Sequence, residues 1–148
     1  MNPQAAEIKL ANSSAEIKRC FPVILQLRPH LQSDNFVRQV QQQMQAGYQL
    51  AYLQDPEITA VAGFNITMNL AWGKHLYVAD LVVDARHRSK GYGEALFTWL
   101  VKYAKERNCQ RLHLDSGVQR FAAHRFYLRQ RMYISSHHFS LILETETQ

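Results

Sequence analysis

The chain has 148 residues, 47% of them hydrophobic and 20% charged, and its formal net charge is +5. This length is enough to bury one hydrophobic core, and this composition excludes an intrinsically disordered chain. The positive charge favours an anionic partner but does not distinguish a nucleotide from a nucleic acid or a membrane surface. We therefore predict one domain over residues 1–148, with a core at about 7–143.

The cysteines and the apolar runs predict a soluble cytoplasmic protein. Cys20 and Cys109 form no closely spaced pair of the kind that binds a metal, and the first residues lack the pattern of a secretory signal. Polar residues interrupt the apolar stretches before they reach the length of a membrane span. We expect reduced thiols and no membrane partner.

The start of the chain predicts a short strand and two helices. Alternating polar and apolar side chains indicate a strand at Glu7–Leu10, and Asn12–Ser14 offer N-cap side chains for a first helix. Pro22 and Pro29 are expected to limit that helix. A second helix should follow and end at Gly47, because glycine suits the left-handed backbone that often ends a helix.

Three β-prone segments then predict antiparallel strands. Each is rich in apolar or β-branched side chains, and turn-forming residues separate them. The three segments are Tyr48–Leu53, Ile58–Leu70 and His75–Val83.

The second half of the chain predicts two helices, a strand between them and closing strands after them. Apolar residues recur at helical spacing in one stretch, namely Tyr92, Ala95, Leu96, Trp99, Leu100 and Tyr103. A strand is expected at Arg111–Asp115, and Ser116 with Gln119 offers a capping box to a helix that includes Ala123–Tyr127. Met132–Leu143 is expected to form one or two closing strands. This order predicts a mixed α/β domain with its strands in one sheet.

The residues before the long helix predict an anion-binding turn. Gly91 and Gly93 let a ligand approach the backbone, and the first N–H groups of the helix have no acceptor within it. Arg86, Arg88 and Lys90 add positive charge. A dinucleotide fingerprint or a P-loop would place glycine and lysine differently, so neither motif matches. A pyrophosphate group would satisfy the free N–H groups of the helix and is the predicted ligand; the alternative is a basic turn whose glycines serve backbone geometry alone.

The Arg88-x-x-Gly91-x-Gly93 sequence of this turn resembles the cofactor motif of the GNAT superfamily of N-acetyltransferases. The resemblance implies acetyl-CoA as acetyl donor, and a mixed, mostly antiparallel sheet of about six to seven strands flanked by about four helices. It also implies that the sheet is splayed after Asp115, with the pantetheine arm of the cofactor on the backbone of the neighbouring strand. The cofactor-binding residues implied in this way are Leu81, Val82, Val83, Arg88, Ser89, Lys90, Gly91, Tyr92, Gly93 and Glu94.

Acetyl transfer to an amine requires an acid for the departing thiolate and the removal of a proton from the amine. The resemblance implies Tyr127 as the acid, because the superfamily commonly carries Ala-x-x-x-Tyr where this chain has Ala123–Tyr127. Asp80 is a candidate to receive the proton of the amine. His113 and Asp115 are further candidates, and both are expected on one face of the strand predicted at Arg111–Asp115. The alternatives are a packing role for Tyr127 and a backbone-bonding role for Asp80 at a β-bulge.

The chain departs from the superfamily pattern at Arg120, where asparagine is common, and at Arg131-Met132, where Gly-Phe is common. Arg120 is expected to contact a phosphate or the acceptor, or to be solvated. His137 and His138 are adjacent in a strand-like segment and would point to opposite faces, so no metal site is predicted. Neither cysteine lies in a nucleophile motif, which favours direct transfer in a ternary complex.

Two other functions fit part of the sequence. The arginines of Arg120–Arg131 suit a nucleic-acid-binding module, although no nucleic-acid-binding motif accompanies them, and a specific nucleic acid is not expected. A pseudoenzyme would bind acetyl-CoA without transferring its acetyl group. The acceptor stays open among small amines, polyamines, amino acids, aminoglycosides and protein amino groups, and the resemblance allows a homodimer.

Overall fold

The computed structural model describes residues 6–144, which form two compact units. The first unit ends at Leu114 and contains all five strands of the described chain. The second unit begins at Asp115 and contains one helix. The α/β class predicted from the order of elements is confirmed.

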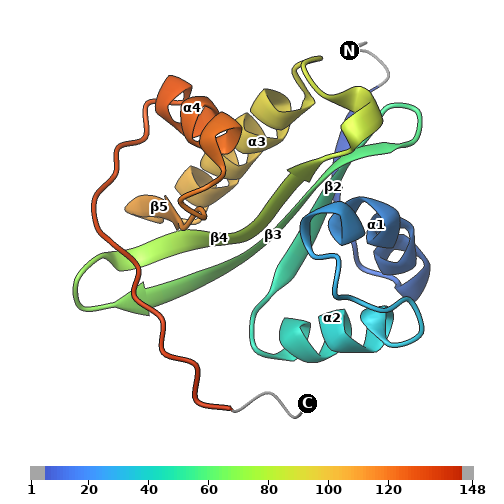
Figure 1. The fold of residues 1–148 in the computed structure, drawn as a ribbon, viewed down its shortest axis with the longest axis horizontal. Coiled ribbons are helices and arrows are strands. Elements are labelled where there is room, and N and C mark those ends of the chain that lie inside the picture. The colour runs from blue at the N-terminus through green and yellow to red at the C-terminus, as the bar shows by residue number, and fades with distance from the viewer. Residues whose placement is uncertain (1–5, 145–148) are drawn as a thin grey trace. The chain divides into compact units, whose positions relative to one another are not determined.

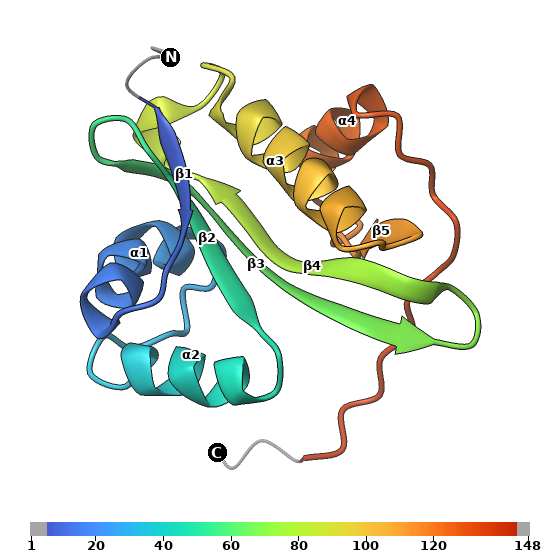
Figure 2. The ribbon, with the colours of Figure 1, turned by 180° about the vertical axis from the view of Figure 1, so that it is seen from behind.

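The five strands form one mixed sheet in the order β1-β2-β3-β4-β5. Figure 1 labels β2 to β5, and Figure 2 shows β1 beside β2. The pairings from β1 to β4 are antiparallel, and β5 is parallel to β4. Each strand confirms a predicted segment. The strands are β1 (Glu7–Leu10), β2 (Gln49–Gln54), β3 (Ile58–Asn69), β4 (Gly73–Val83) and β5 (Arg111–Leu114).

Helices cover both faces of this sheet (Figure 2). α1 (Ser14–Leu27) and α2 (Phe36–Gln45) pack on one face, and α3 (Tyr92–Glu106) packs on the other. Because successive side chains of a strand point to opposite faces, the sheet contributes to two hydrophobic cores. These cores include Ile17, Leu50 and Val61 on the α1 side, and Phe64, Leu76 and Leu96 on the α3 side.

Local sequence explains how α1 begins and ends. Oγ of Ser13 accepts from the N–H of Glu16 at 3.1 Å, and Oε1 of Glu16 accepts from the N–H of Asn12 at 3.3 Å. Ser13 thus caps the helix, and the Glu16 carboxylate bonds the residue before the N-cap, in a variant of the capping box. The helix ends before Pro29, but Pro22 lies inside it, which corrects the prediction. Pro22 is tolerated because it is on the exposed side of the helix, where water can bond the carbonyl that loses its helical partner.

β4 extends beyond its parallel neighbour. β5 pairs only with His75–Val78, so within residues 6–144 the end of β4 has no strand on the side away from β3. The N–H of Asp84 donates to the carbonyl of Thr59 at 2.8 Å. Because hydrogen bonds alternate along an antiparallel pair, the N–H and C=O groups of Leu81 and Val83 face the unpaired side. The open edge therefore coincides with the strand to which the resemblance assigns the pantetheine arm.

A β-bulge interrupts the pairing of β3 with β4 beside this edge. Gly63 pairs with Asp80, but Phe64 pairs with Val78, so Ala79 is the extra residue. A bulged residue is left outside the regular ladder, and its backbone groups need other partners. The bulge therefore exposes backbone of β4 to side chains from other elements.

The helix of the second unit is α4 (Phe121–Arg129). It begins after the N-cap residue Arg120 rather than after a capping box of Ser116 and Gln119, which corrects the prediction. The N–H of Arg120 bonds the carbonyl of Gly117 at 3.0 Å. This turn occupies the residues that the predicted cap would have used, so the helix starts later.

No strand follows α4 in residues 6–144, so the closing strands predicted at Met132–Leu143 are wrong, and the sheet has five strands instead of six to seven. The segment has strand-like composition, but a strand also needs a neighbouring strand to bond and a core to cover. Its large apolar side chains are instead exposed, namely those of Tyr133, Ile134, Phe139, Leu141, Ile142 and Leu143.

Candidate functional site

The turn between β4 and α3 has the backbone geometry of an anion site. After the short 3-10 helix η1 (Ala85–His87), Gly91 takes the N-cap position of α3 with φ +88°. Ser89 also lies in the left-handed region, with φ 61°. The first helical bond joins the N–H of Ala95 to the carbonyl of Gly91 at 3.0 Å. A Cβ on Gly91 would have no heavy atom within 4 Å, so the space in front of the helix is open.

Backbone donors and cations gather at this end of α3. The N–H groups of Tyr92, Gly93 and Glu94 precede the first helical bond and carry the positive end of the helix dipole. Arg88 and Lys90 are exposed, and neither forms an ion pair with any of residues 6–144. Donors of this kind suit an anion of pyrophosphate size.

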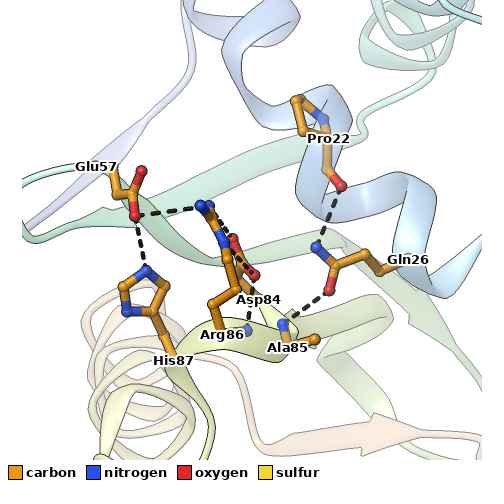
Figure 3. Close-up of polar contacts among 7 residues, drawn as sticks. All are labelled: Pro22, Gln26, Glu57, Asp84, Ala85, Arg86 and His87. Carbon is orange, nitrogen blue, oxygen red and sulfur yellow. Dashed lines mark hydrogen bonds and ion pairs between the residues drawn. The ribbon is translucent and has the colours of Figure 1, made fainter.

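A polar cluster behind the turn binds Arg86 (Figure 3). Nη2 of Arg86 lies 2.9 Å from Oδ2 of Asp84 and 3.6 Å from Oε1 of Glu57. Nε2 of His87 lies 2.8 Å from the same Glu57 oxygen. Hydrogen bonds from the Arg86 side chain hold the pKa of the buried Asp84 carboxyl below its usual range. Arg86 therefore stabilises the turn. Arg88 and Lys90, the other two cations predicted there, have no carboxylate partner among the described residues.

Two further hydrogen bonds attach the turn to neighbouring elements. Oε1 of Gln26, on α1, accepts from the N–H of Ala85 at 2.8 Å (Figure 3). The hydroxyl of Tyr92 donates to Oδ2 of Asp55, beside β2, at 3.0 Å. The Tyr92 side chain is thus buried, and its contribution to a ligand would come from its backbone. These bonds fix the turn to α1 and to the end of β2.

Asp80 lies at the bulge, and two side-chain donors reach its carboxylate. Nε of Arg28 is 2.9 Å from Oδ1, and the hydroxyl of Tyr48 is 2.9 Å from Oδ2. Arg28 follows α1 and Tyr48 precedes β2, so residues from three parts of the chain meet at this carboxylate. Burial and the Asp80 charge raise the pKa of Tyr48 above its ordinary value, so its hydroxyl remains a donor.

His113 and Asp115 do not share a strand face, which corrects the prediction. β5 ends at Leu114, so Asp115 lies outside the strand and in the second unit. The His113 ring stacks on the Trp72 ring, with 3.7 Å between their centroids. Oδ2 of Asp115 lies 3.5 Å from Nδ1 of His138 within the second unit. The stack gives His113 a packing contact that the sequence did not indicate.

Tyr127, the predicted acid, lies on α4 in the second unit. Burial raises the pKa of its phenol, and the neighbouring Arg120 guanidinium lowers it by less. The phenol therefore carries its proton at neutral pH, as a proton donor must. The proximity of Arg120 to Tyr127 is a further contact that sequence reasoning missed.

Sequence reasoning also missed the partners of Asp80. Arg28 and Tyr48 are separated from it by 52 and 32 positions, so no local motif joins them. One signal was present: Gly63 interrupts a β-prone segment, and glycine inside a strand often marks a bulge or a close approach of another group.

Among residues 6–144, no group of three or more His, Cys, Asp or Glu side chains is placed to hold a metal ion. Over the same residues, no helix combines the length and the apolar character needed to cross a bilayer.

Comparisons with known sequences identify a family and a relative. Residues 15–131 match the model of a family described as the acetyltransferase (GNAT) family. A relative from Bacillus subtilis (strain 168), described as the uncharacterized N-acetyltransferase YhdJ, is 33% identical over 122 residues. That match covers 81% of this chain and 86% of the relative.

Solved structures share the fold over almost the whole chain. Glucosamine-6-phosphate N-acetyltransferase from Arabidopsis thaliana has a TM-score of 0.74 at 22% identity, and the match covers 94% of this chain and 99% of that one. A structure described as a transcriptional regulator from Bacillus halodurans C-125 has a TM-score of 0.83 at 19% identity, with 93% and 99% covered. At these identities the likeness is one of fold.

Proposed function

Because the chain belongs to the acetyltransferase (GNAT) family and is an acetyltransferase, we propose that it transfers an acetyl group from acetyl-CoA to a primary amine. One observation carries this proposal: the open N-terminus of α3 and the unpaired edge of β4 lie at the two ends of one short turn. The first suits a pyrophosphate, and the second suits the amide groups of a pantetheine arm.

The proposed cofactor site combines the β4 edge, the turn and the start of α3. The helix amides bind pyrophosphate oxygens, and Arg88 and Lys90 add charge-assisted contacts. On the β4 edge, the backbone groups of Leu81 and Val83 face the ligand, whereas those of Val82 face β3. The residues proposed to bind the cofactor are Leu81, Val83, Arg88, Ser89, Lys90, Gly91, Tyr92, Gly93 and Glu94, and Val82 supports them by bonding the edge to β3.

The reaction forms a C–N bond at the thioester carbonyl and breaks the C–S bond, while the amine loses one proton and the thiolate gains one. We propose that Tyr127 gives the proton to the thiolate and that Asp80 receives the proton of the amine. Each Asp80 oxygen accepts one bond from a protein donor, and a carboxylate oxygen has a further lone pair for an acceptor N–H. Direct attack in a ternary complex requires no protein nucleophile.

A thiol-release assay with acetyl-CoA and an amine panel tests this function. The panel contains small amines, polyamines, amino acids, aminoglycosides and short peptides, and reactions without amine measure hydrolysis. Amine-dependent thiol release, with the matching N-acetyl product in mass spectrometry, supports the proposal. Absence of product with every amine, in a protein that binds acetyl-CoA, would reject it.

A further inference from the structure

The ion pair between Arg28 and Asp80 presents a positive and a negative group side by side, next to the edge proposed for the cofactor. Nε of Arg28 lies 2.9 Å from Oδ1 of Asp80. The Arg28 side chain is 44% exposed and the Asp80 side chain is 17% exposed, so a ligand can reach both groups.

Contacts on both sides hold this pair in place. Nη2 of Arg28 donates to the carbonyl of the bulged Ala79 at 2.9 Å, and Tyr48 holds the second oxygen of Asp80. Tyr48 can approach because Gly63 has no side chain: a Cβ there would overlap the phenol. Partly exposed ion pairs contribute little to stability. A gain in stability therefore does not explain why the bulge, Gly63 and the buried Tyr48 surround this pair. The orientation of its two charges toward a ligand does.

Both members of the pair keep hydrogen-bonding capacity. Arg28 uses Nε and Nη2 in the contacts above, whereas its Nη1 has no partner among residues 6–144. The guanidinium group has five N–H donors, so those on Nη1 remain for an anionic group. Each Asp80 oxygen likewise has capacity for one more donor.

We propose that Arg28 and Asp80 bind the acceptor, and that the acceptor is a zwitterionic amine of the amino-acid class. Its ammonium group contacts Asp80, and its carboxylate contacts Nη1 of Arg28. The complement of two fixed opposite charges is a ligand that carries two opposite charges at a similar spacing. Polyamines and aminoglycosides carry only positive charge, which Arg28 repels. This inference rests on the proposed function and narrows its acceptor.

A panel of L-amino acids, each paired with its α-amide, tests the inference at saturating acetyl-CoA. Both members of a pair have a primary amine, but only the acid has the anionic group. The wild-type protein should have the higher kcat/KM with acids. Arg28→Met should lower kcat/KM by roughly 10- to 100-fold for the acid, the factor carried by a charge-assisted hydrogen bond, and much less for the amide. The loss of kcat/KM for the acid is divided by the loss for its α-amide. This ratio does not depend on the difference in amine pKa between the two substrates.

Two controls separate this role from a structural one. Acetyl-CoA affinity by calorimetry should be the same in Arg28→Met as in the wild type, because Arg28 is not in the proposed cofactor site. Arg28→Lys, which keeps the charge but loses the planar fork, should retain part of the preference for acids. It also serves as the test if Arg28→Met does not fold.

The outcomes distinguish this inference from the proposed function. Equal losses with acid and amide would indicate a structural Arg28 and overturn the inference. Transfer to amides or polyamines in preference to amino acids would overturn it too, while leaving acetyl transfer to amines intact. No transfer to any amine of either panel would instead reject the proposed function, and this inference with it.

Discussion

A methyl group on Gly63 would overlap the phenol of Tyr48, whose hydroxyl binds Asp80 at 2.9 Å. Gly63, which lies on β3 beside the bulge, thus sets the position of the Tyr48 side chain. Gly63→Ala should push Tyr48 away and destabilise the protein by about 1–3 kcal/mol, the usual cost of overpacking a core. Urea denaturation of the purified variants measures this loss.

A double-mutant cycle shows whether the overlap is the cause. In a Tyr48→Ala background the phenol is absent, so Gly63→Ala should cost much less there than in the wild type. Gly117→Ala is the control, because its nearest neighbours are atoms of the flexible Gln119 side chain. The same cost for Gly63→Ala in both backgrounds would contradict the assigned contact.

Asp84 should give the folded protein a pH-dependent stability. Its pKa is lowered in the folded state because Arg86 bonds the charged form. A lowered carboxyl pKa adds stability above the unfolded-state value of about 3.9, and this stability is lost as the pH falls toward the folded-state value. From about pH 4 down to pH 2, the unfolding free energy of the wild type should therefore fall more steeply with pH than that of Asp84→Asn. The difference between the two slopes should correspond to the uptake of up to about one proton on unfolding.

Unfolding free energies from urea curves between about pH 2 and pH 7 test this difference. Asp34→Asn, at an exposed carboxyl in the chain before α2, is the matched control and should follow the wild-type slope. Parallel curves for the wild type and Asp84→Asn would show that the Asp84 and Arg86 contact does not favour the charged carboxyl.

Tyr127→Phe removes one hydroxyl and retains the ring. If this hydroxyl protonates the departing thiolate, kcat should fall by about 10²- to 10⁴-fold, the usual range for general acid catalysis, with little change in acetyl-CoA affinity. Tyr133→Phe removes a hydroxyl from a side chain that is 77% exposed, and it should leave kcat unchanged. A kcat of the wild-type value in Tyr127→Phe would remove Tyr127 from the mechanism.

Features that depend on neighbouring residues could be predicted from the sequence. The apolar spacing of α3, the Ser13 N-cap of α1 and the left-handed Gly47 after α2 are local properties of the chain, and the structure confirms them. The turn before α3 is local as well, because Gly91 and the helix that follows it are adjacent. Local signals therefore predicted the fold class and the element that carries the cofactor proposal.

Features that depend on distant contacts could not be predicted in this way. Asp80 meets Arg28 and Tyr48 only after α1, β3 and β4 have packed together. Met132–Leu143 has a strand-like pattern, but composition does not say whether a neighbouring strand is present. Pro22 disfavours a helix by itself, yet packing of the apolar side of α1 keeps the helix continuous around it.

The charge carried at position 91 tests the central claim, that acetyl-CoA binds at the N-terminus of α3. Gly91 has φ +88°, a region that asparagine and aspartate both tolerate, and the two side chains have nearly the same shape. Gly91→Asn and Gly91→Asp therefore share any backbone strain and differ by one negative charge in the open space before the helix. With equal melting temperatures for the free proteins, calorimetry should give acetyl-CoA a Kd at least about tenfold weaker in Gly91→Asp than in Gly91→Asn. Equal affinities in the two folded variants would contradict the account.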